Sequence, residues 1–189
     1  MQEKKNKQKA NQKSSKKVSD FLEKNQIHKK DFAQMIGVTL SYVYNLIDEA
    51  IPFSTRGTTL ERIAVVMDIL PEEFDEYVIQ ADPVPYNKNL DTIREYIKKN
   101  KLSTVEFLKK FERKKRLQMV DILRGARPLS ADFAQLQKIG EILNIEKEEL
   151  FNLWKNIFTE YLQEGDFDTD ANEGLLNAMF NGAKKYILK

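Results

Sequence analysis

The chain has 189 residues, no cysteine and one histidine, and its formal net charge is +2. The lack of cysteine excludes disulfides and thiolate metal sites and fits an intracellular, cytoplasmic location. No apolar run approaches the roughly 18–20 residues that span a bilayer, so no membrane contact is expected. The lysine-rich start lacks the apolar segment of a signal peptide, so secretion is not expected either.

The charge is unevenly distributed along the chain. Residues 1–17 hold seven lysines and one glutamate (+6), and residues 18–80 hold five basic and eleven acidic residues (−6). Residues 81–155 hold sixteen basic and eleven acidic residues (+5), and residues 156–189 hold three and six (−3). We therefore expect regions with different electrostatic roles.

The first 17 residues are polar and lysine-rich and show no hydrophobic periodicity, which predicts a disordered tail. Apolar residues at helical spacing follow, with Gly37 interrupting the pattern and Pro52 and Gly57 marking a loop. No segment of this region alternates polar and apolar residues as a half-buried strand does. We therefore predict an all-α domain of short helices over residues 18–80.

The sequence beyond this domain repeats its pattern. FLEKNQIHKKDF (21–32) aligns with YIKKNKLSTVEF (96–107) at an offset of 75, and LERIAVVMDILPEEF (60–74) aligns with LQKIGEILNIEKEEL (136–150) at 76. Two blocks in one order at nearly one offset indicate an internal duplication, and chance matching of amphipathic helices is the alternative. The predicted parts are a disordered tail (1–17), a first domain (18–80), a linker (81–88), a second, divergent domain (89–155) and a C-terminal helical extension (156–189).

The string DFAQMIGVTLSYVYNLI (31–47) has the spacing of two short helices held at a steep angle. Such a pair needs a small residue where the helices cross and a turn residue that tolerates positive φ, and Ala33 and Gly37 supply them. Val43 and Leu46 then face the core from the second helix.

Apolar residues of a later helix close the core behind this pair, and the five-helix order resembles the Cro/repressor (XRE) family of helix-turn-helix proteins. The resemblance covers about residues 18–77 and again about 90–153. It implies an all-α fold with two tandem lambda-repressor-like five-helix helix-turn-helix domains, plus a C-terminal helix. The same fold also serves in protein–protein contacts, so the function depends on its exposed residues.

In the family, the second helix of the pair lies in the major groove of double-stranded DNA, and its exposed N-terminal side chains touch base edges. Asn45 can pair with adenine through two hydrogen bonds, Ser41 can hydrogen-bond a base edge, and Leu40 suits a thymine methyl. The alternative is that these residues form a solvated helix face. The base-contacting candidates are Thr39, Leu40, Ser41, Tyr44 and Asn45.

Phosphate-contacting candidates lie in both repeats. Lys29 stands where the family places a phosphate contact, at a helix start whose amides also favour phosphate, and Arg56 lies in the loop after the helix pair. In the second repeat, one residue is inserted between about 112 and 117, and Glu112 replaces the turn glycine. The candidates in that repeat are Arg113, Lys114, Lys115, Arg116 and Arg124.

Two interpretations of this basic run stay open: a patch that holds phosphates, or a solvated charge run. Under the first, the intact corner reads the sequence while the basic turn positions the protein.

Two features count against DNA binding by the first domain alone. Its charge is −6, whereas non-specific affinity comes mainly from neutralised phosphates, and it has Ile47-Asp48-Glu49 where the family often has Glu-Arg-Gly.

The C-terminal extension contains DFDTDANEGLLN (166–177), which begins like a calcium loop. Its sixth residue is alanine and its twelfth is asparagine, so two defining features fail and an acidic loop is predicted. The helix that follows has an apolar face, which either packs on the core or makes a homodimer contact. That face consists of Leu175, Leu176, Met179, Phe180, Ile187 and Leu188.

The function expected from these features is sequence-specific DNA binding by a transcriptional regulator. The alternative is a helix-turn-helix-fold protein-interaction module, antitoxin-like or a regulator's partner, with little or no DNA binding. His28, the only histidine, fits a capping or solvent-facing place better than a catalytic one. Without cysteine, a phosphate-binding glycine loop or a recognisable carboxylate pair, no enzyme activity, cofactor or metal is expected.

Overall fold

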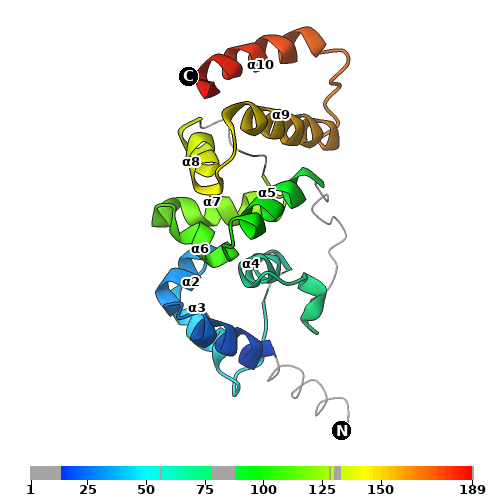
Figure 1. Cartoon of the computed structure of the whole chain (residues 1–189). Coiled ribbons are helices and arrows are strands. Elements are labelled where there is room, and N and C mark those ends of the chain that lie inside the picture. The colour runs from blue at the N-terminus through cyan, green and yellow to red at the C-terminus, as the bar shows by residue number, and fades with distance from the viewer. Residues whose placement is uncertain (1–13, 56, 78–87, 128, 130–132, 189) are drawn as a thin grey trace. The chain divides into compact units, whose positions relative to one another are not determined.

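The computed structural model describes residues 14–188 except 56, 78–87, 128 and 130–132. Within these ranges every regular element is a helix (Figure 1), which confirms the predicted all-α class. In the same ranges, no helix is both long and apolar enough to cross a membrane. Most of the predicted tail and nearly all of the predicted linker lie outside the described residues. Helical residues 14–24 are followed by α2 (Lys29–Ile36), α3 (Leu40–Ile47), α4 (Gly57–Met67), η1 (Pro71–Glu73), α5 (Lys88–Lys99), α6 (Thr104–Lys109), α7 (Arg113–Leu123), α8 (Phe133–Leu143), α9 (Lys147–Glu164) and α10 (Glu173–Ile187).

The chain divides into two compact units that do not follow the two sequence repeats. The first unit takes Met1–Pro83 together with Thr104–Val120, and the second takes Val84–Ser103 together with Asp121–Lys189. Helix α6 and most of α7 belong to the second repeat by sequence. In the structure they are part of the first unit.

Helix α4 packs against both α2 and α6 within the first unit. Asp68 follows α4 in a left-handed conformation (φ 56°). Its carboxylate accepts the backbone N–H of Thr104 at 3.2 Å and also the hydroxyl proton of the same residue, so it caps the start of α6. The core of this unit includes Phe32, Met35, Ile36, Val43, Leu60, Ile63, Phe107 and Leu108.

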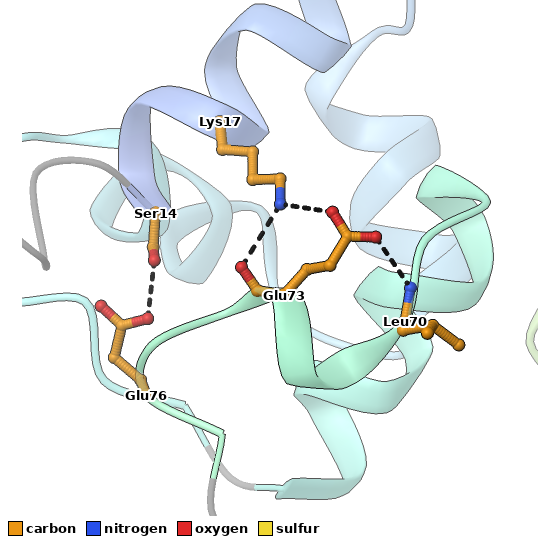
Figure 2. Close-up of polar contacts among 5 residues, drawn as sticks. All are labelled: Ser14, Lys17, Leu70, Glu73 and Glu76. Carbon is orange, nitrogen blue, oxygen red and sulfur yellow. Dashed lines mark hydrogen bonds and ion pairs between the residues drawn. The ribbon is translucent and has the colours of Figure 1, made fainter.

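Residues 14–17 are helical, which corrects their predicted place in a disordered tail. The hydroxyl of Ser14 donates to a carboxylate oxygen of Glu76 at 2.6 Å, and the Lys17 ammonium lies 3.0 Å from the Glu73 carboxylate (Figure 2). Lys17 also lies over the ring of Phe74, 5.3 Å from its centroid. These contacts with a distant acidic segment hold the first helical turn in place, and the local sequence gives no sign of them.

The second unit is organised around Trp154 of α9. Its ring lies 5.7 Å from that of Phe158 and 5.8 Å from that of Phe180 on α10, centroid to centroid. The rings of Phe151 and Phe133 lie 5.9 and 6.2 Å away. Helix α10 thus closes this core from the C-terminal end of the chain, and it runs along α9 (Figure 1).

Candidate nucleic-acid interface

The link between α2 and α3 is a three-residue turn that depends on glycine. Gly37 has φ 73°, in the left-handed region, and its N–H donates to the carbonyl of Ala33. A Cβ at this position would lie only 2.9 Å from both methyl carbons of Leu117. The left-handed backbone therefore favours glycine here, and any larger residue would also have to displace the Leu117 methyls.

Helix α3 divides cleanly into a buried and an exposed side. Val43 and Leu46 are buried, as their spacing predicts, and Tyr42 is anchored by its hydroxyl, which donates to the carbonyl of Ser54 at 3.2 Å. The five residues predicted to touch bases are all exposed, and Tyr44 is 54% exposed. We call them the exposed face of α3, which consists of Thr39, Leu40, Ser41, Tyr44 and Asn45.

Thr39 has a structural role that the sequence analysis did not assign to it. Its side-chain oxygen accepts the backbone N–H of Tyr42 at 3.2 Å, so Thr39 is the N-cap of α3. A threonine directly before an apolar-periodic run is the usual signal for such a cap. The hydroxyl proton remains available to a hydrogen-bond acceptor.

Positive charge borders the exposed face of α3. The Lys29 ammonium, in the first turn of α2, lies 5.5 Å from the ring centroid of Tyr44. The side chain of His28, the N-cap of α2, makes no capping hydrogen bond. His28 is exposed to solvent, which is one of the two places expected for it.

The basic run of the second repeat, Arg113 to Arg116, contacts α2 through ion pairs with Asp31. One carboxylate oxygen of Asp31 lies 3.2 Å from Nη1 of Arg116 and 3.4 Å from Nε of Arg113. The Arg116 side chain is 11% exposed and also donates to the carbonyl of Phe111 at 3.2 Å, whereas the Arg113 side chain is 59% exposed. Arg116 thus makes a nearly buried ion pair that joins α7 to α2, and the Arg113 side chain stays largely in solvent.

The other phosphate-contacting candidates differ in how accessible they are. Lys114 is largely exposed, with its ammonium 3.1 Å from the Glu112 carboxylate, and Lys115 is half-buried. Arg124, in the second unit, is nearly buried and lies 3.0 Å from the carboxylate of Asp121. Arg56 lies outside the described residues. Arg113 and Lys114 are therefore the exposed candidates of the first unit, whereas Lys29 is half-buried like Lys115.

The predicted turn in the second repeat is helical instead. The run from Arg113 to Arg116, which sequence analysis placed in that turn, forms the first turn of α7. Helix α7 has 11 residues where α3 has 8. Without a glycine to adopt the left-handed conformation, the chain enters the helix early, and the inserted residue is taken up there.

Comparisons with known proteins add no identification. The sequence matches no protein-family model, no curated protein and no solved structure. Among the described residues, no group of three or more histidine, cysteine, aspartate or glutamate side chains is placed to hold a metal ion. The case for a function therefore depends on the exposed face of α3 and the charges around it.

Proposed function

We propose that this chain is a sequence-specific DNA-binding regulator of transcription that acts in the cytoplasm. In this proposal α2 and α3 form a helix-turn-helix of the Cro/repressor type, and the second repeat is a diverged copy of the same five-helix domain. The observation that carries the proposal is the exposed face of α3, where amide, hydroxyl and apolar groups stand together beside the Lys29 ammonium.

The chemistry of this face matches the edges of bases in the major groove of double-stranded DNA. The Asn45 amide offers a donor and an acceptor to adenine, and Leu40 offers an apolar surface to a thymine methyl. Ser41, on the same side of the helix as Asn45, adds a hydroxyl that can donate or accept.

The electrostatics also support DNA binding, through the helices that the second repeat contributes to the first unit. Residues 104–120 hold six basic and two acidic residues, which offsets most of the negative charge of residues 18–80. In this proposal Lys29, Arg113 and Lys114 neutralise phosphates, which supplies sequence-independent affinity. The first unit is therefore less acidic than residues 18–80 alone, so its charge opposes DNA binding less than the sequence analysis expected.

The direct experiment is selection of binding sequences from a random pool of double-stranded DNA with the full chain. Binding of the selected sequence is then compared for Asn45→Ala and for a matched control, Asn152→Ala, at an exposed position of α9. Asn45→Ala should reduce the preference for one base pair by about 1–3 kcal/mol, and Asn152→Ala should leave it unchanged. If Asn45→Ala kept the full preference, base reading by α3 would be refuted.

One observation favours a second candidate, a protein-binding module. Leu40 and Tyr44 are large, partly apolar and exposed on neighbouring turns of α3, which also suits contact with a protein partner. The same experiment separates the two functions. A folded sample that enriches no sequence and binds no DNA at low salt would favour the protein-binding module.

A further inference from the structure

Helix α10 carries two apolar stripes, although the sequence suggested one face. Leu176, Phe180 and Ile187 are buried in the second unit. The remaining stripe is exposed, with Leu175 65% and Met179 39% accessible to solvent. Its members are four, three and four residues apart, which places them on one side of an α-helix. This outer stripe consists of Leu175, Met179, Gly182 and Tyr186. The ring of Tyr186 stacks on that of Phe133 at 5.6 Å and is still 65% exposed.

Gly182 is not explained by its own chain. Within the described residues, a Cβ on Gly182 would meet no atom closer than 4 Å, so no neighbouring atom requires a glycine there. A glycine inside a helix costs about 1 kcal/mol relative to alanine. That cost is accounted for if a second helix approaches α10 closely at this point, between Met179 and Tyr186.

We propose that the outer stripe binds the outer stripe of a second copy of this chain, with the two α10 helices antiparallel about a twofold axis. When the axis passes between residues 180 and 181, Met179 of one copy faces Gly182 of the other, and Leu175 faces Tyr186. A large side chain therefore meets a small one at the centre of the contact. The stripe is self-complementary, as an interface with twofold symmetry requires.

The charges at the two ends of α10 favour the antiparallel orientation. Residues 166–173 hold four acidic residues and no basic one, whereas Lys185 is exposed in the last turn of the helix. The other lysine of that turn, Lys184, already pairs with Glu148 of α9. An antiparallel pair places the acidic end of each copy near Lys185 of the other, and a parallel pair places like charges together. One helix face per copy is a small interface, so we expect a dissociation constant in the micromolar range. The dimer does not rest on the proposed DNA binding.

The first test is the mass of the full chain in solution, measured by sedimentation equilibrium over a range of concentrations. The parent should pass from monomer to dimer as concentration rises, and Gly182→Leu should stay monomeric because the leucine blocks the close approach. Gly174→Leu is the matched control, since Gly174 is equally open and lies outside the stripe. A parent that stays monomeric up to several hundred micromolar, or a Gly182→Leu variant that still dimerises, would overturn the proposal.

A second test fixes the orientation and does not depend on affinity. The chain has no cysteine, so single cysteines can be introduced without background. In the antiparallel pair, two copies of position 179 are about 5 Å apart along the helix axis, and two copies of position 175 are about 16 Å apart, at 1.5 Å per residue. Met179→Cys should therefore form a disulfide-linked dimer under mild oxidation, and Leu175→Cys should not. Efficient linking through position 175 would overturn the antiparallel arrangement.

Discussion

The two corners of the first unit, α2–α3 and α6–α7, come from equivalent stretches of the two repeats but make their turns differently. Each pair of helices is separated by three residues. The first corner uses Gly37 in a left-handed conformation, and the second has Glu112 in the link and an α7 that is longer than α3. The second corner is stabilised by side chains, because Arg116 binds both the Phe111 carbonyl and the Asp31 carboxylate.

This difference shows that two corners of similar sequence can be stabilised in different ways within one unit. The first corner keeps an exposed helix face, and the second corner packs one side of α7 onto the first, with Leu117 over the turn at Gly37. Packing of this kind removes Arg116 from most of the surface and leaves Arg113 exposed beside Asp31 of α2, with Lys114 exposed next to it in sequence. The two corners therefore pack together within one unit, and variants of each should have different consequences.

The largest expected effect comes from replacing the glycine of the first corner. Gly37→Val should destabilise the protein by about 3 kcal/mol, since a β-branched residue is strained at positive φ and the Leu117 methyls would have to shift to admit its Cβ. The control is Glu112→Gly at the equivalent position, which should cost less than about 1 kcal/mol. Urea unfolding of the full chain measures both. Equal losses for the two variants would show that the corners do not differ as described.

The next effect separates the two arginines that share Asp31. Arg116→Ala should cost about 2 kcal/mol, because it leaves a nearly buried carboxylate and the Phe111 carbonyl without this partner. Arg113→Ala should cost less than about 0.5 kcal/mol, since an exposed ion pair contributes little. The same urea unfolding compares them, with Asp31→Asn as the background for a double-mutant cycle. A larger loss of unfolding free energy for Arg113→Ala than for Arg116→Ala would contradict the assignment of Arg116 as the buried partner of Asp31.

These contacts explain how far the sequence could predict the structure. The α2–α3 corner was predictable because its signals are local: Ala33, Gly37 and the apolar spacing of α3 lie within a few turns of one another. The place of the basic run was not, because Arg116 and Asp31 are 85 residues apart and their pairing depends on how two repeats pack. The two stripes of α10 share one helical periodicity, so only the packing against α8 and α9 distinguishes them.

A smaller effect tests whether the second corner supports DNA binding by the first. Lys114→Glu should weaken binding to every DNA sequence alike and should reduce the slope of log affinity against log salt by about 1. Its stability should stay within about 0.5 kcal/mol of the parent, as expected for an exposed side chain. Fluorescence anisotropy at several salt concentrations measures the slope. Lys98→Glu, at an exposed position of α5, is the control. An equal change in slope for both variants would refute a phosphate contact specific to Lys114.

The smallest effect concerns two equivalent glutamates that the repeats use differently. Glu73 and Glu149 correspond at the offset of 76. The Lys17 ammonium, together with the N–H of Leu70, lowers the pKa of Glu73. Glu149 instead accepts the hydroxyl proton of Tyr96, which stands where the first repeat has Phe21. That hydrogen bond raises the pKa of Tyr96 to about 12.

The two shifts act on stability at opposite ends of the pH range. Because the pKa of Glu73 is lowered by folding, its contribution is present above the unfolded pKa and is lost as pH falls through the folded one. Because the pKa of Tyr96 is raised, its contribution is present below pH 10 and is lost between about 10 and 12. The urea midpoint is measured as a function of pH for each variant. In Lys17→Gln it should fall less steeply toward acid pH than in the parent, and in Tyr96→Phe it should fall less steeply toward alkaline pH. Each variant is the control for the other, and a change at the wrong end of the range would show that the repeats do not divide these roles.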